Sequence, residues 1–123
     1  MGKIPGDIEK LGFEVAHIGI NTAGDSQALA AAERFHFLFG WAVQSGKDSL
    51  YAEPKLEIMK NGGRGTHGHI AVATNDINAA QNYLESKGCV FAADSAKYNE
   101  QGKLIVIYLK DEIAGFAIHL LQK

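Results

Sequence analysis

Residues 15–22, VAHIGINT, return later in the chain as residues 67–74, HGHIAVAT. Both stretches alternate apolar residues with small or polar ones, which is typical of a half-buried strand. An alanine-rich segment follows each stretch and ends at a glycine, Gly40 in the first copy and Gly88 in the second. An internal repeat of this kind predicts that one structural unit occurs twice in the fold.

Each alanine-rich segment carries the start and stop signals of a helix. Asp25 or Ser26 can cap the first helix, and Asn75 or Asp76 can cap the second, while the glycines suit the left-handed residue that ends a helix. Apolar residues recur at spacings of three and four, so each helix should bury one stripe. The expected stripes are Leu29, Ala32, Phe35 and Leu38 in the first helix, and Ile77, Ala80 and Leu84 in the second.

Three short strand-like runs follow each helix, at residues 41–43, 49–52 and 56–59 and again at residues 90–92, 104–109 and 116–121. Each copy therefore reads strand–helix–strand–strand–strand. We predict an α+β fold of two tandem βαβββ modules, whose strands form a cupped, mostly antiparallel eight-stranded sheet with the helices outside. The expected divisions of this single domain are an N-terminal lead-in at 1–12, modules at 13–60 and 67–123, and a linker at 61–66.

Composition narrows the class of protein. The chain has 123 residues, a net charge of −2 and a single cysteine, Cys89. It is too short for a complete large barrel, lacks the basic field of a nucleic-acid or membrane-surface binder, and cannot form an internal disulfide. No apolar run is long enough for a signal peptide or a spanning helix. We expect a cytoplasmic protein without nucleic-acid or membrane partners.

Strand parity indicates a candidate metal site. Side chains alternate between the two faces of a strand, and His17, Glu57, His69 and His119 all fall on the face opposite the helices. In a cupped sheet these four side chains can converge. Imidazoles and a carboxylate suit a divalent ion such as Zn²⁺, Ni²⁺, Co²⁺, Mn²⁺ or Fe²⁺. An ion would also satisfy polar groups that are costly to bury unpaired.

Simpler interpretations apply to each residue taken alone. A single strand histidine is more often structural, and a single strand glutamate is more often solvated; four at matching repeat positions favour a site. His67 shares parity with His69 and competes with it as a ligand, whereas His36 is expected to pack or face solvent, and Cys89 to be a buried thiol. The aromatic residues around the end of the first helix are expected in the core: Phe35, Phe37, Phe39 and Trp41.

The chain resembles the vicinal oxygen chelate superfamily, which includes glyoxalase I, bleomycin- and fosfomycin-resistance proteins, methylmalonyl-CoA epimerase and extradiol dioxygenases. The resemblance covers about residues 13–122 and is carried by residues 16–20 (AHIGI), 37–41 (FLFGW), 56–59 (LEIM) and 68–71 (GHIA). In this superfamily the first and last strands of each module supply metal ligands. The resemblance therefore implies a divalent metal ion held by His17, Glu57, His69 and His119.

A closer likeness is to a glyoxalase-like domain appended to bacterial 2-keto-3-deoxy-6-phosphogluconate and 4-hydroxy-2-oxoglutarate aldolases. Residues 95–98 (SAKY) and 107–120 (IYLKDEIAGFAIHL) carry it. Those aldolases use a lysine inside a barrel of around 200 residues, which this chain is too short to contain. Lyase activity of that kind therefore either needs association with an aldolase or is absent.

The resemblance implies a glyoxalase-like, metal-dependent lyase or isomerase. It would act on a small 2-keto or 2-hydroxy acid by chelating two neighbouring oxygens and stabilising an enediolate. Glyoxalase I usually has a glutamate where this chain has His119, so either Glu57 or His119 would be the catalytic base, or the chemistry is not proton abstraction. The alternatives are a non-catalytic metabolite-binding module associated with the aldolase, and an antibiotic-sequestering protein. A homodimer is expected, as paired modules in this superfamily often complete the cavity across a two-fold axis.

Overall fold

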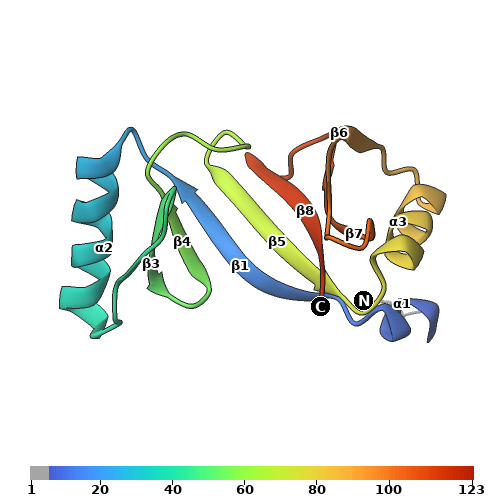
Figure 1. Cartoon of the computed structure of the whole chain (residues 1–123), viewed down its shortest axis with the longest axis horizontal. Coiled ribbons are helices and arrows are strands. Elements are labelled where there is room, and N and C mark those ends of the chain that lie inside the picture. Colours follow the sequence, from blue (N-terminus) through green and yellow to red (C-terminus); the bar gives the residue numbers. More distant parts are fainter. Residues whose placement is uncertain (1–5) are drawn as a thin grey trace.

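The computed structural model describes residues 6–123 and confirms the predicted architecture, an open eight-stranded sheet with helices outside it (Figure 1). Residues 1–5 of the expected lead-in lie outside the described part of the chain. The elements are, in order, α1 (Gly6–Leu11), β1 (Glu14–Asn21), α2 (Asp25–Phe39), β2 (Gln44–Ser45), β3 (Ser49–Glu53), β4 (Leu56–Met59), β5 (Gly68–Thr74), α3 (Ile77–Ser86), β6 (Phe91–Tyr98), β7 (Leu104–Leu109) and β8 (Phe116–Gln122).

The strand order is β2-β3-β4-β1-β5-β8-β7-β6, so the two βαβββ units lie edge to edge and meet where β1 pairs with β5. This central pairing is antiparallel. Within each unit the first strand pairs in parallel with the last, β1 with β4 and β5 with β8, and the remaining neighbours are antiparallel. The sheet is thus mostly antiparallel, as predicted, and its four central strands are β4, β1, β5 and β8.

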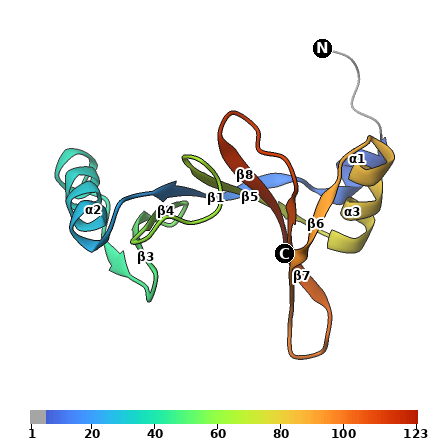
Figure 2. The same cartoon turned by 90° about the horizontal axis from the view of Figure 1, so that it is seen from above.

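The helices cover the two ends of the sheet rather than its middle. Figures 1 and 2 show α2 beyond β3 at one end and α1 with α3 at the other. The contacts agree, because α2 packs on β3 and β4 while α3 packs on β7 and β8. Each unit has its own apolar core, centred on Ile58 in the first and on Ile77 and Leu120 in the second. No helix within residues 6–123 is both long and apolar enough to cross a membrane.

The buried face of α2 differs from the predicted stripe. Ala28 and Ala32 are fully buried, with Ala31 and Phe35 packed beside them, whereas Leu29 and Leu38 are about half exposed. The small alanine face lets the helix lie close to β3 and β4, so larger neighbours turn outward. Two aromatic residues expected in the core are exposed for the same reason, Phe37 by 80% and Phe39 by 59%. Phe35 and Trp41 are half-buried and stack on each other.

The helix caps were predicted correctly in one unit only. In the second unit Asp76 is the N-cap of α3, where its carboxylate accepts a hydrogen bond from the Ala79 amide at 3.1 Å. In the first unit Gly24 is the N-cap of α2 and offers no side chain, so the assignment to Asp25 or Ser26 was wrong. Gly40 does end α2 in the left-handed conformation, at φ 73°.

Two strands differ from the predicted runs. Residues 41–43 are not a strand, and the edge strand β2 follows them as only two residues. Strand β6 extends to Tyr98 through a register shift, in which the buried Ser95 hydroxyl donates to the Ala92 carbonyl and accepts from the Tyr108 amide. Ile18 and Ile20 were expected under the first helix but are only half-buried, because α2 covers β3 and β4 instead of β1.

Candidate metal centre

The register of the four central strands sets out the candidate site. On β1, Gly19 lies opposite Glu57 of β4 on one side and opposite His69 of β5 on the other. One pleat along the same face, His17 and His119 lie on either side of Ala71. Two adjacent rows of the sheet therefore carry all four predicted residues, each separated from the next in its row by glycine or alanine.

Small residues in these rows let the large side chains meet. A Cβ atom added at Gly19 would overlap the imidazole ring of His69, so only glycine leaves room for the ring to lean across β1. Ala71 is fully buried between the other two histidines. Because small residues alternate with large ones along each row, the large side chains can lean over the small residues and contact one another above the sheet.

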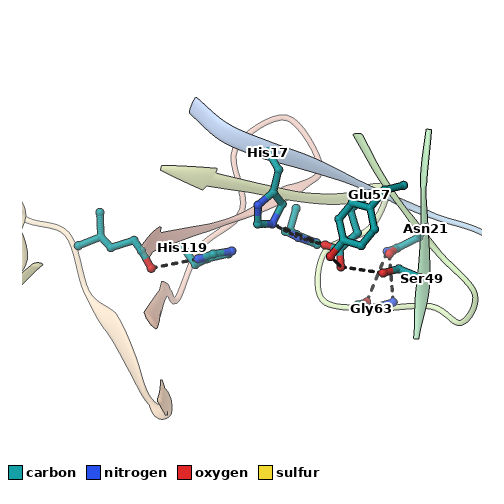
Figure 3. Close-up of polar contacts among 9 residues, drawn as sticks. His17, Asn21, Ser49, Glu57, Gly63 and His119 are labelled. Atoms are coloured by element: carbon teal, nitrogen blue, oxygen red, sulfur yellow. Dashed lines mark hydrogen bonds and ion pairs between the residues drawn. The ribbon is translucent and has the colours of Figure 1, made fainter. Parts of the chain in front are cut away.

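The distances within the cluster are short. The Nε2 atoms of His17 and His69 are 3.2 Å apart, and Oε1 of Glu57 lies 3.5 Å from the first and 3.1 Å from the second. His119 joins the two other histidines, and ligand atoms of all three lie within 4.8 Å of one another. Figure 3 shows the His17 and Glu57 side chains pointing toward one another. The structure thus brings together the four residues that strand parity selected.

Two hydroxyl groups hold the other oxygen of Glu57. The hydroxyls of Ser49 and Tyr51 both donate to Oε2 at 3.0 Å. The hydrogen bond from His69, helped by those from Ser49 and Tyr51, lowers the pKa of Glu57 to about 2 despite partial burial. Glu57 is therefore an anion at neutral pH, with Oε1 directed at the histidines.

Burial keeps His119 neutral and a backbone carbonyl fixes its tautomer. Its Nδ1 lies 3.0 Å from the Leu120 carbonyl oxygen, which can only accept, so Nδ1 carries the proton and Nε2 keeps a free lone pair. Desolvation lowers the pKa of His119 to about 4, and desolvation likewise lowers the pKa of His17. Metal-binding histidines commonly donate their second N–H to a carbonyl in this way.

The remaining titratable candidates lie elsewhere. His67 is exposed and packs against Phe116, so it does not join the cluster although it shares parity with His69. The ring of the exposed His36 contacts the Trp41 carbonyl oxygen at 2.7 Å. Cys89 is half-buried and free.

Three residues around the cluster were not predicted from the sequence, Ser49, Tyr51 and Tyr108. Ser49 and Tyr51 alternate with the buried Leu50 and Ala52, so parity along residues 49–52 could have placed them on the face of Glu57. Tyr108 lies opposite His119 in the register, and the two rings are 4.7 Å apart. Its pKa is raised, chiefly by burial. Loop residues lack the two-residue alternation of a strand, so the sequence pattern cannot place them near the cluster.

The donor set fits a divalent transition-metal ion. Ligands about 2.1 Å from one ion, at tetrahedral or octahedral angles, lie about 3.0–3.4 Å from each other. The three distances among the Nε2 atoms of His17 and His69 and Oε1 of Glu57 fall at or close to this range. Imidazole nitrogen with one carboxylate is also the ligand chemistry of zinc, nickel, cobalt, manganese and iron sites.

Comparison with known proteins identifies the fold. No protein-family model matches the chain, and no curated protein matches it in sequence. Among solved structures, a hypothetical protein of Bacillus halodurans C-125 matches with a TM-score of 0.63 and 16% identity, over 90% of this chain and 94% of that one. A methylmalonyl-CoA epimerase follows at 0.60 and 16%, over 88% and 93% of the two chains. The epimerase of Mycobacterium tuberculosis gives 0.59 and 18%, over 88% and 86%. This chain has the fold of the methylmalonyl-CoA epimerases.

Replacing Gly19 with alanine tests the packing of the cluster. The added methyl group overlaps the His69 ring, so we expect His69 to move out of line and the affinity for Zn²⁺ to fall about tenfold or more. The control is Gly24→Ala, where a Cβ atom meets nothing within 4 Å. Zinc titration of both variants by calorimetry makes the measurement, and an unchanged affinity in Gly19→Ala contradicts this packing.

The lowered pKa values predict an acid-labile protein once metal has been removed. Unfolded His119 would take up a proton near its ordinary pKa of 6.5, but folded His119 does so only near 4, so protons favour the unfolded chain between these values. The free energy of unfolding should fall by roughly 3 kcal/mol as the pH drops through this window. Glu57 adds a further loss as the pH falls from 4.5 toward 2.

Urea unfolding of the chelator-treated protein at about pH 7 and about pH 4.5 measures this loss. The variant His119→Asn should lose much less stability over the same interval, because its side chain does not titrate. Equal pH dependence in the two proteins would contradict the assignment to His119.

Proposed function

We propose that this protein belongs to the vicinal oxygen chelate superfamily. We further propose that it is a metal-dependent lyase or isomerase that enolises a small 2-keto or 2-hydroxy acid. One observation carries the proposal: the imidazoles of His17 and His69 and the carboxylate of Glu57 converge at the spacing of ligands around one ion. The fold shared with methylmalonyl-CoA epimerases supports it. One such structure is a complex with methylmalonyl-CoA, a small-molecule substrate.

His17, His69 and Glu57 would hold the ion. When bound, a divalent cation polarises a substrate carbonyl and offsets the negative charge of the enolate. The chain keeps Glu57 anionic through Ser49 and Tyr51 and presents both imidazoles through their Nε2 atoms. His17 is the more open of the two histidines, with 23% of its side chain exposed, so a substrate would approach from its side.

His119 is the better of the two candidates for proton transfer. Both Glu57 oxygens face hydrogen-bond donors or imidazoles, and its pKa of about 2 makes it a weak base. His119 is neutral and has a free Nε2 lone pair, and its Nδ1–H is anchored on the Leu120 carbonyl. We propose that His119 accepts the substrate proton at Nε2 and returns it to the product.

Metal binding is the first test. The chelator-free protein should bind about one divalent ion per chain, and His17→Gln or His69→Gln should weaken binding about 100-fold or more because each removes a ligand. The matched control is His67→Gln, two residues from His69 but outside the cluster, which should bind normally. Calorimetry with zinc, nickel, cobalt and manganese makes the measurement. A wild-type protein without stoichiometric metal contradicts the proposal.

Proton exchange is the second test. In D₂O the metal-loaded protein should exchange a C3 proton of a 2-keto acid or the C2 proton of a 2-hydroxy acid, and a chelator should stop this. His119→Gln should keep its metal and slow exchange about 100-fold or more. Proton NMR with a panel of such acids follows the loss of signal. Full-rate exchange in His119→Gln overturns the role of His119, and no exchange with any acid overturns the enolisation.

The predicted partners remain proposals. All four cluster residues come from one chain, so this part of the site does not need a second copy. We propose a homodimer nonetheless, because Phe37, Leu38 and Phe39 expose consecutive apolar side chains at the end of α2. Light scattering tests the dimer, and co-purification tests the proposed association with an aldolase.

A further inference from the structure

The loop at residues 61–65 is fixed to β1 by hydrogen bonds and places Arg64 near the sheet face that holds the cluster. Asn21 lies on the same face of β1 as His17, and its side-chain amide binds the loop at residues 61–65. Its Nδ2 donates to the Gly65 carbonyl at 3.0 Å, and its Oδ1 accepts from the Gly63 amide at 3.0 Å. Figure 3 shows Asn21 and Gly63 beside the cluster. Arg64 lies between these two anchored glycines.

The Arg64 side chain reaches the edge of the cluster through one aromatic ring. Its guanidinium carbon lies 4.8 Å from the centre of the Tyr108 ring, and that ring lies 4.7 Å from the ring of His119. Stacking on a tyrosine orients the flat guanidinium without using its N–H donors. Arg64 is thus separated by the Tyr108 ring from His119, the residue proposed to carry the proton.

The donors of Arg64 are open to a ligand. Within residues 6–123, its one ion pair is with Asp94, at 4.0 Å, and the two side chains are 47% and 85% exposed. No hydrogen bond from the guanidinium occurs among these described residues. An exposed pair at this distance contributes little stability, so an anionic ligand can replace Asp94 at low cost.

A second cation adds to the positive field on this side of the site. Lys97 lies opposite Val106 in the pairing of β6 with β7, two residues along β7 from Tyr108. Val106 and Tyr108 share a face of β7, so the register places Lys97 on that face too. The charge of Lys97 is among the causes that lower the pKa of His119, which agrees with this placement.

We propose that Arg64 binds a second anionic group of the substrate, a carboxylate or a phosphate. This group lies at the end of the substrate opposite the two oxygens that would chelate the ion held by His17, His69 and Glu57. This inference rests on the function proposed above. The guanidinium fork matches either group with paired hydrogen bonds. Charge agrees as well: neutral imidazoles, one carboxylate and a divalent ion leave one positive charge, and Arg64 and Lys97 add to it, which suits a substrate with two negative groups.

Two acids of equal length isolate the second anionic group. 2-Oxoglutarate and 2-oxopentanoate share the 2-keto acid end that would chelate the ion, but only 2-oxoglutarate carries a second carboxylate at its other end. Calorimetry with the zinc-loaded protein should show tighter binding of 2-oxoglutarate. Arg64→Gln should weaken that binding about 10- to 100-fold and leave 2-oxopentanoate and zinc affinities unchanged. Arg34→Gln, an exposed arginine on α2, is the matched control and should change nothing.

The outcomes separate this inference from the proposed function. Failure of the wild type to bind zinc contradicts both. Normal zinc binding with equal affinity for the two acids, or with no effect of Arg64→Gln, overturns the inference alone. 3-Phosphoglycerate distinguishes the two anions: an Arg64-dependent affinity for it above that for 2-oxoglutarate assigns phosphate, and the reverse order assigns carboxylate.

Discussion

The structure depends on the register of β1 between β4 and β5. That register places Gly19 directly between Glu57 and His69, and it places Ala71 between His17 and His119 one pleat away. Because a strand repeats every two residues, a shift of one residue would send the His17 side chain to the opposite face. The antiparallel meeting of β1 and β5 therefore joins the two units and also assembles the candidate site from both.

Burying the polar groups of the cluster costs free energy unless they have hydrogen-bond partners, and neighbouring residues supply such partners. Ser49 and Tyr51 satisfy one oxygen of Glu57, and the Leu120 carbonyl takes the N–H of His119. The nitrogens of His17 and His69 and the second oxygen of Glu57 then face one another at close range. The N–H of His69 already stabilises Glu57 in the metal-free protein, and a metal ion would stabilise all three groups at once. Desolvation disfavours extra protons on His17 and His119.

The sequence predicts the fold and the four clustered residues because both follow from periodicity. The repeat gave two units, and the alternation of side chains placed His17, His69 and His119 on one face. Features set by tertiary packing were not predictable in this way. The alanine face of α2 lies against β3 and β4, which leaves Phe37 exposed although it is strongly apolar. Arg64 lies in a loop, where no periodicity relates it to Tyr108.

The fold alone does not determine chemistry, so the functional account depends on the cluster itself. An anomalous difference map from crystals grown with zinc and without chelator tests it most directly. The account predicts one strong peak per chain, bonded to Nε2 of His17, Nε2 of His69 and Oε1 of Glu57. A map without a peak at these atoms, or with the peak on His67 or His36 instead, would contradict the assignment of this cluster as a metal centre.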